Sequence, residues 1–146
     1  MLKARPGKEV VVRVENAVGT LDEIAKIVSD RGANLLATCA WVEGDRAVVH
    51  LVTDDHRRVL EALAARYVDV READVVISEA PHKPGMLRRA TDRLAAGDID
   101  IHHFYATASM AQDQCLFVFA TANNDRAVVL LNGRAEHAAP YSRADV

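Results

Sequence analysis

The pattern of apolar and polar positions alternates between strand-like and helix-like spacing in the first half of the chain. The run EVVVRVE at residues 9–15 is rich in β-branched residues, which favour a buried strand. Over residues 21–28, apolar positions recur at the three- and four-residue spacing of an amphipathic helix. Thr20 and Glu23 have the spacing of a capping box at the start of this helix, and Gly32 is placed to end it. The chain is therefore expected to begin with a strand and a helix.

Two more strands, a second helix and a short strand follow. Residues 33–42 and 46–53 are strand-like runs joined by the turn-forming sequence EGD, which predicts a hairpin. The next helix opens with Asp54 or Asp55 as its N-cap and has apolar residues along one face. VDVRE at residues 68–72 is predicted to form a short strand. The predicted order is strand, helix, strand, strand, helix, strand.

The second half of the chain repeats this order with an offset of 66 residues. The offset carries Gly19 onto Gly85, and it also relates four further pairs: Leu21 and Leu87, Val28 and Leu94, Asn34 and Asp100, Leu35 and Ile101. The predicted elements are a strand at 74–80, a helix at 86–96 ended by Gly97, strands at 99–109 and 114–121, and a helix at about 125–131 capped by Asn123 or Asn124. The last strand of this copy has no clear candidate, because residues 133–146 are polar and contain Pro140.

Two copies of this order predict an α+β protein with two ferredoxin-like βαββαβ units. Each unit would place two helices on one face of a four-stranded antiparallel sheet. The expected boundaries are residues 8–73 for the first domain and 74–135 for the second, with a frayed tail at 136–146. This fold serves enzymes, RNA-binding proteins and sensors alike, so it does not by itself indicate a function.

Composition narrows the classes of function. Half of the 146 residues are hydrophobic, the formal net charge is −3 and only 5% are aromatic, which argues against a nucleic-acid-binding surface. Cys39 and Cys115 are isolated and lack CxxC spacing, as is common in a reducing compartment. The N-terminal sequence MLKARPGKEV has no apolar stretch of the kind found in signal peptides, and no run approaches a membrane span. We expect a soluble, cytoplasmic protein.

Each copy carries two short motifs around its first helix. The first copy has NAVGTL at residues 16–21 and GANL at 32–35, and the second has HKPGML at 82–87 and IDI at 99–101. These motifs resemble those of ACT domains, small amino-acid-sensing modules whose usual pattern is Asp/Asn-x-Pro-Gly-x-Leu, a helix and then Gly-x-Asn-Ile. The resemblance spans about residues 8–132 and is greatest to stand-alone tandem ACT proteins without a catalytic domain.

The resemblance implies that an amino acid or a similar small effector binds at these turns, where two units meet in a homodimer. A glycine turn lets a ligand approach the backbone closely, and the N–H groups of the first helical turn favour a carboxylate. The side-chain oxygen of Asn16 could accept a hydrogen bond from the ligand's ammonium group, and Asn34 could contact either end. Val18 replaces the usual proline and His82 the usual Asp or Asn, so one loop or both could bind. The candidate ligand-binding residues are Asn16, Ala17, Val18, Gly19, Thr20, Leu21, Asn34, Leu35, His82, Lys83, Pro84, Gly85, Met86, Leu87, Asp100 and Ile101.

Other interpretations stay open at this point. The glycines could serve only their turns, and Asn16 could only cap its helix. The chain could be a regulatory subunit that docks on an amino-acid biosynthetic enzyme. A metal sensor would use His102 or His103 with Cys115, although adjacent strand residues point to opposite faces unless a bulge intervenes. No catalytic constellation or cofactor-binding motif is recognisable, so we expect neither enzyme activity nor a cofactor.

Overall fold

The computed structural model describes residues 1–133 and divides the chain into two compact units. The first unit is residues 8–74, and the second combines residues 1–7 with the chain from residue 75 onward. The predicted tail at 136–146 lies outside the described residues. Within the described part of the chain, no helix is both long and apolar enough to cross a membrane.

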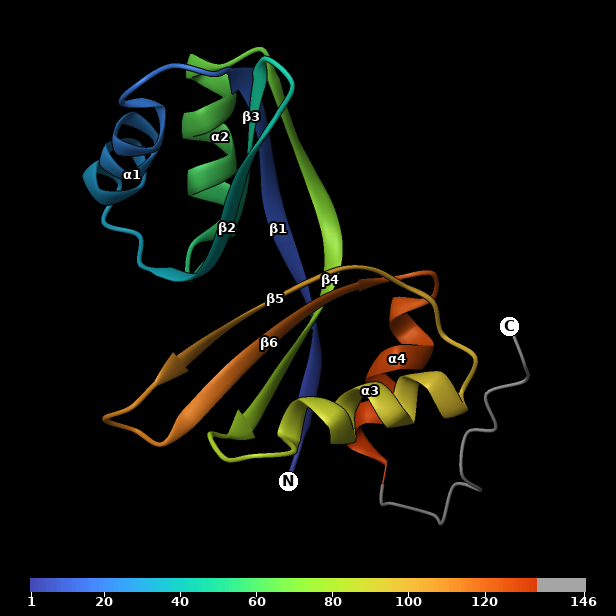
Figure 1. Cartoon of the computed structure of the whole chain (residues 1–146). Coiled ribbons are helices and arrows are strands. Elements are labelled where there is room, and N and C mark those ends of the chain that lie inside the picture. Colours follow the sequence, from blue (N-terminus) through green and yellow to red (C-terminus); the bar gives the residue numbers. More distant parts are fainter. Residues whose placement is uncertain (134–146) are drawn as a thin grey trace. The chain divides into compact units, whose positions relative to one another are not determined.

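Two helices cover one face of a four-stranded sheet in the first unit (Figure 1). The elements are β1 (Lys3–Glu15), α1 (Thr20–Asp30), β2 (Leu35–Glu43), β3 (Arg46–Thr53), α2 (His56–Arg66) and β4 (Asp69–Pro81). The strand order is β2-β3-β1-β4, and β3 pairs antiparallel with β1 and β2. Apolar residues on alternate strand positions face the helices, because successive side chains of a strand point to opposite faces. The resulting core consists of Val10, Val12, Ile24, Val28, Val49, Leu51, Val59 and Leu63.

The second unit has the same plan. After β4 the chain forms α3 (Met86–Ala96), β5 (Ile101–Ser109), β6 (Gln114–Thr121) and α4 (Asn124–Asn132). The strand order is β1-β4-β6-β5, and β6 pairs antiparallel with β4 and β5. Its core consists of Leu2, Val76, Ala80, Met86, Ala90, Leu94, Cys115, Phe117, Phe119, Ala127 and Leu131. The predicted α+β class with two ferredoxin-like units is confirmed.

The internal repeat is visible in the bounds of the elements. β1 and β4 begin 66 residues apart, and so do α1 and α3, and β2 and β5. From β3 and β6 onward the offset is 68, because the loop of the first hairpin, residues 44–45, is two residues shorter than the loop at 110–113. The repeat predicted from five residue pairs therefore holds for every helix and strand that the two copies share.

The N-terminal residues supply the fourth strand position of the second unit. β1 runs through both units: residues 3–7 belong to the second and residues 8–15 to the first. Leu2 is buried in the core of the second unit and Ala4 packs against that core. Sequence analysis found no clear strand at the end of the second copy, and the N-terminal segment takes that place in the sheet.

Candidate functional site

Both glycine loops are tight turns that lead directly into a helix. In the first loop the Thr20 amide donates to the Ala17 carbonyl at 3.3 Å, and in the second the Met86 amide donates to the Lys83 carbonyl at 3.4 Å. The third residue of each turn is a glycine in the left-handed region, Gly19 at φ 89° and Gly85 at φ 87°. These are the features of a type II turn, whose third position strongly favours glycine.

Glycine is required at these positions by backbone conformation rather than by lack of space. A Cβ atom added to Gly19 or Gly85 would meet no other atom within 4 Å, yet a left-handed φ strains an L-residue. Proline favours the second position of such a turn, and Pro84 occupies it in the second copy. In the first copy this position holds Val18, whose side chain is fully exposed. The second turn is therefore the more rigid of the two.

The helices that follow these turns begin without a side-chain cap, unlike the other two helices. The side chain of Asp55 accepts from the Arg58 amide at the start of α2, and that of Asn123 accepts from the Arg126 amide at the start of α4. No described side chain caps α1 or α3. The amides of the second and third residues of each helix, Leu21 and Asp22 in α1 and Leu87 and Arg88 in α3, precede the first intrahelical bond and are thus available to an exogenous acceptor.

The predicted capping box at the start of α1 is wrong. The turn makes Gly19 the N-cap residue, so Thr20 is already inside the helix. The Thr20 hydroxyl instead donates to the Ala17 carbonyl at 2.9 Å, and the Glu23 carboxylate pairs with Arg66 at 2.7 Å. Asn16 does not cap the helix either. The other two predicted caps are confirmed: of the two candidates for each helix, Asp55 caps α2 and Asn123 caps α4.

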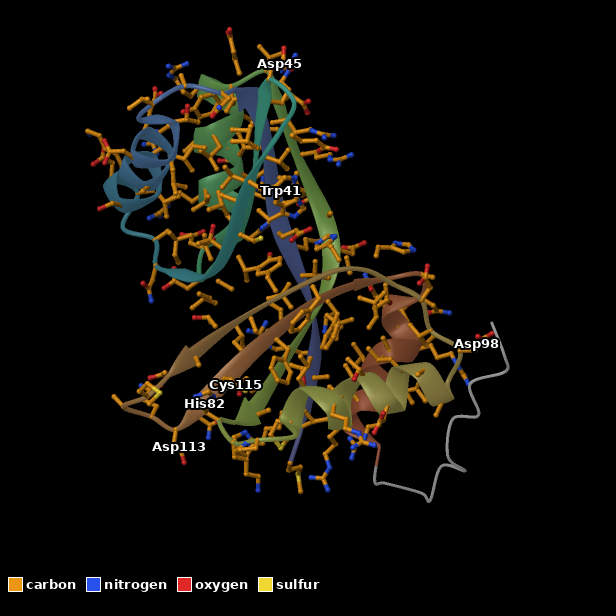
Figure 2. All side chains as sticks on the ribbon, in the orientation of Figure 1. Trp41, Asp45, His82, Asp98, Asp113 and Cys115 are labelled. Carbon is orange, nitrogen blue, oxygen red and sulfur yellow. The ribbon has the colours of Figure 1, made fainter. Side chains whose placement is uncertain are left out.

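A pocket of about 270 Å³ lies beside the second glycine loop. One side is formed by the loop and the first turn of α3, and the other by the adjoining ends of β5 and β6. Figure 2 shows His82 and Cys115 in this part of the second unit, near the tip of the hairpin that Asp113 marks. The lining residues are His82, Lys83, Gly85, Met86, Leu87, Ala106, Thr107, Ala108, Cys115 and Phe117.

The chemistry of the pocket is apolar at its wall and cationic at its rim. Met86 and Phe117 are buried and Lys83 is exposed. None of the described residues that line the pocket carries a carboxylate. Cys115 is buried and its thiol points to the Pro81 carbonyl at 3.8 Å, and burial raises the pKa of this thiol. A small anion with an apolar part matches this lining.

Four of the predicted site residues lie away from the glycine loops. Asn34 and Leu35 follow α1, and Asp100 and Ile101 follow α3. Each helix has 11 residues, so about 16 Å of helix separates the two ends. The main-chain amide of Asn34 donates to the Asp54 carboxylate at 2.8 Å. The structure thus groups residues 16–21 at the first glycine turn and the start of α1, and 82–87 at the second turn and the start of α3, without these four.

The structure does not bring the histidines of β5 together with Cys115. A bulge lies between Ile101 and His103 in the pairing with β6. The rule that adjacent side chains of a regular strand point to opposite faces therefore does not apply to His102 and His103. His102 is largely exposed and its Nε2 lies 3.7 Å from Asp100, whereas His103 stacks on Tyr105 with ring centroids 6.1 Å apart. Within residues 1–133, His102, His103 and Cys115 are not gathered in one cluster of metal-ligating atoms.

Sequence reasoning missed the wall of the pocket that β5 and β6 provide. The His82 amide donates to the Asp113 carbonyl at 2.9 Å, which joins the glycine loop to the tip of the hairpin. The first copy has the equivalent bond from Asn16 to Asp45, also at 2.9 Å. A motif search finds only the loop and helix, because Ala106, Thr107 and Ala108 have no distinctive pattern in the sequence.

Comparisons with known proteins agree with this architecture. A family model described as an ACT domain pair matches residues 7–139. A solved structure of a protein from Bacteroides thetaiotaomicron is similar, with 25% sequence identity, 88% of each chain covered and a TM-score of 0.78. The ligand-free regulatory subunit of aspartate kinase from Thermus thermophilus has 11% identity over 89% of this chain and 93% of its own, with a TM-score of 0.64.

The corresponding regulatory subunit from Thermus flavus has 12% identity over 90% of this chain and 93% of its own, with a TM-score of 0.57. These aspartate kinase subunits share the fold with the present chain. Among curated proteins, none matches the chain. The repeated βαββαβ order, the two glycine turns and the family match lead to one conclusion: the chain belongs to the ACT domain family, whose members are small-molecule-binding regulatory domains, and consists of a pair of such domains.

Proposed function

We propose that this protein binds a free amino acid or a similar small carboxylate in the pocket beside Gly85, and acts as a non-catalytic regulatory protein of the cytoplasm. The observation that carries the proposal is the pocket itself, which adjoins the uncapped N-terminus of α3. Because a bound ligand stabilises whichever arrangement of the protein binds it better, such a site is sufficient for regulation.

The carboxylate of the ligand binds at the first turn of α3. The first intrahelical bond there runs from the Arg89 amide to the Gly85 carbonyl at 2.9 Å, so the amides of Leu87 and Arg88 precede it and lack partners within the helix. The partial positive charge of the helix N-terminus favours an anion at this place. The exposed Lys83 ammonium group adds to the positive field at the rim.

The body of the ligand rests on the apolar wall of the pocket. Met86, Phe117 and Ala108 offer carbon surface to it. A volume of about 270 Å³ is slightly below the usual range for small-molecule sites, roughly 300 to 1,000 Å³. The size favours a free metabolite over a nucleotide or a larger cofactor.

The first loop, residues 16–21, is a second position for the same kind of ligand. It shares the type II turn and the uncapped helix, and Asn16 supplies a carboxamide where the second copy has the imidazole of His82. We propose further that the protein is a homodimer and that ligand binding changes how the subunits or a regulated enzyme associate.

A thermal-shift screen against the proteinogenic amino acids tests the proposal. A ligand at about 100 times its dissociation constant raises the free energy of unfolding by about 2.7 kcal/mol. For a domain of this size that corresponds to a rise of roughly 5 °C or more in the melting temperature. Absence of any shift across amino acids and related carboxylates would refute the proposal.

Matched glycine variants assign the loop. Gly19→Val and Gly85→Val place the same side chain at nearly the same φ, with open space at both positions, so the backbone strain is comparable. We expect Gly85→Val to remove the larger part of the ligand-induced shift and Gly19→Val to retain that part. Asn16→Ala tests the polar side chain of the first loop. Equal ligand shifts in all three variants would contradict the assignment of the site.

A further inference from the structure

The two glycine loops differ in the polar side chains beside their turns. The 66-residue offset aligns the carboxamide of Asn16 with the imidazole of His82, and it aligns Ala17 with Lys83. The first loop therefore offers a side-chain oxygen, whereas the second offers a ring and an ammonium group. Because the two loops share a backbone turn but not these side chains, they should differ in the ligands that they prefer.

No side chain that faces the second pocket carries an oxygen atom. Ala106 pairs with Phe117, and Ala108 pairs with Cys115. Both partners pack in the core with residues of α3, so the two alanines face α3 as well. Thr107 lies between the alanines, and its hydroxyl therefore points to the opposite face of the sheet. The other lining side chains lack oxygen too, and they belong to His82, Lys83, Met86 and Leu87.

The main chain of the loop offers donors rather than acceptors. The carbonyls of Pro81, Lys83 and Gly85 each accept a main-chain hydrogen bond already, at 3.0, 3.4 and 2.9 Å. The amides of Leu87 and Arg88 precede the first intrahelical bond and have no partner within the helix. The polar groups that a ligand meets at this end of the pocket are therefore mainly these two amides and the Lys83 ammonium group.

The α-ammonium group of an amino acid finds little to bind among these groups. Among the side chains that face the pocket, the only nitrogen or oxygen able to accept a hydrogen bond is one ring nitrogen of neutral His82. Lys83 lies at the same rim, and its charge repels a second ammonium group. A charged group that loses water without gaining partners weakens binding.

We propose that the pocket beside Gly85 prefers a short aliphatic carboxylate without an α-ammonium group, such as an α-keto acid, over the matching amino acid. The polar end of an α-keto acid has acceptors only, and these match the donors of Leu87, Arg88 and Lys83. Its aliphatic chain suits the apolar wall and the volume of about 270 Å³. This inference rests on the proposed function, because it concerns the ligand of the same pocket.

A site-resolved NMR titration tests the preference. ¹⁵N-labelled protein is titrated separately with α-ketoisovalerate and with L-valine, and each dissociation constant is taken from the amide signals of Leu87 and Arg88. These amides report on the second loop and not on the first. We expect the dissociation constant of L-valine at these signals to be roughly tenfold or more above that of the keto acid. The pairs pyruvate with L-alanine and phenylpyruvate with L-phenylalanine extend the comparison to smaller and larger side chains.

Copying the first loop onto the second should reduce the preference. His82→Asn with Lys83→Ala gives the second loop the residues found at positions 16 and 17, which supplies an acceptor and removes the repelling charge. The ratio of the two dissociation constants should then fall several-fold. Arg126→Ala removes a positive charge from an exposed position of α4 that does not line the pocket, and it should keep the wild-type ratio.

The outcomes separate this preference from the proposed function. Binding of the amino acid as tight as that of the keto acid at the signals of Leu87 and Arg88 would overturn the preference and leave the proposed function in place. A double variant that keeps the full wild-type ratio would do the same. Signals that move with neither compound of any pair would overturn the proposed function as well.

Discussion

The carboxamide of Asn132 in α4 binds both main-chain polar groups of Ala4 in β1. The Ala4 amide donates to Asn132 Oδ1 at 2.7 Å, and Asn132 Nδ2 donates to the Ala4 carbonyl at 2.8 Å. The two residues are 128 positions apart in the sequence. This pair of hydrogen bonds fastens the N-terminal segment to the last described helix of the second unit.

Replacing Asn132 should therefore loosen the N-terminal strand. Asn132→Ala removes both bonds and leaves an unpaired edge amide, which should lower the free energy of unfolding by about 1 to 2 kcal/mol. Hydrogen exchange should accelerate at residues 2–6 more than in the first unit. Asn132→Asp keeps the acceptor and loses the donor, so its effect should be intermediate. Unchanged protection at residues 2–6 in the alanine variant would contradict this role.

Ser78 places an unsatisfied hydroxyl in the core of the second unit. It is fully buried in β4, and its Oγ has no hydrogen-bond partner in residues 1–133. The equivalent position of the first unit holds Val12. Because a buried hydroxyl without a partner costs free energy, Ser78→Ala should stabilise the protein by up to about 1 kcal/mol. Denaturant unfolding measures the change, and a loss of more than about 1 kcal/mol would show that the hydroxyl is satisfied.

Backbone conformation, rather than the space around the side chain, should determine which residues are tolerated at position 85. Gly85→Ala should cost about 1 to 2 kcal/mol, because alanine is strained at φ 87° although no neighbour obstructs its Cβ. Gly85→Asn should cost less despite the larger side chain, because asparagine tolerates the left-handed region better. Thermal unfolding of both variants decides between the two causes. A larger loss for asparagine would indicate crowding.

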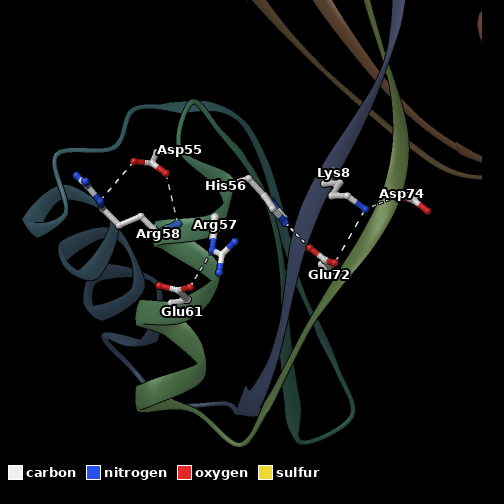
Figure 3. A network of polar contacts seen from close by, with 8 residues as sticks. All are labelled: Lys8, Asp55, His56, Arg57, Arg58, Glu61, Glu72 and Asp74. Carbon is white, nitrogen blue, oxygen red and sulfur yellow. Dashed lines mark hydrogen bonds and ion pairs between the residues drawn. The ribbon is translucent and has the colours of Figure 1, made fainter.

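The pairing of Glu72 with His56 predicts an acid-sensitive contribution to stability. The two side chains are 2.8 Å apart between Oε2 and Nε2, and Lys8 lies between Glu72 and Asp74 (Figure 3). The hydrogen bond to His56, with the charge of Lys8, lowers the pKa of Glu72. A lowered folded pKa gives stability that is present above the pKa of an unfolded glutamate, about 4.3, and is lost as the pH falls through the folded pKa.

Glu72→Gln isolates this contribution. We expect the wild type to be more stable than the variant above the unfolded pKa and the difference to shrink as the pH is lowered further. Urea unfolding of both proteins across the acidic range measures it. Glu61→Gln serves as the control, since Glu61 pairs with Arg57 on the exposed face of α2 (Figure 3). A difference that grows on acidification would have the wrong sign for this pairing.

The two cysteines should respond differently to a bound effector. Cys115 lines the pocket, and burial raises the pKa of its thiol, whereas Cys39 lies on β2 of the first unit. Since the thiolate is the reactive form, Cys115 should react slowly with iodoacetamide, and more slowly still when the pocket is filled. Mass spectrometry of each cysteine with and without the effector measures this. Protection confined to Cys39 would count against the pocket.

The sequence predicted the repeated fold well because local pattern and long-range packing agree in it. The helix at 86–96 has the predicted bounds, since its apolar spacing, preceding glycine turn and Gly97 all indicate the same element. The strand made by residues 3–7 could not be predicted, because KARPG is polar and resembles a terminal tail. Its place in the sheet depends on contacts such as that of Leu2 with the core of the second unit, which no local pattern records.

The candidate site was predictable only in part for the same reason. The glycine loops carry a local signal, because a left-handed φ restricts the residue type at Gly19 and Gly85. The capping box failed because Thr20 and Glu23 have the right spacing, but the turn starts the helix one residue earlier than the box requires. The wall formed by Ala106 and Phe117 depends on strand pairing, which brings together residues distant in sequence.

The most direct test of the central claim is an NMR titration of uniformly ¹⁵N-labelled protein with the amino acid that gives the largest thermal shift. We expect the largest changes in amide chemical shift at Gly85, Leu87 and Arg88, with smaller ones at residues 106–108. These amides line or adjoin the pocket at the start of α3. Saturable binding that leaves these signals unmoved and shifts amides elsewhere would contradict the account.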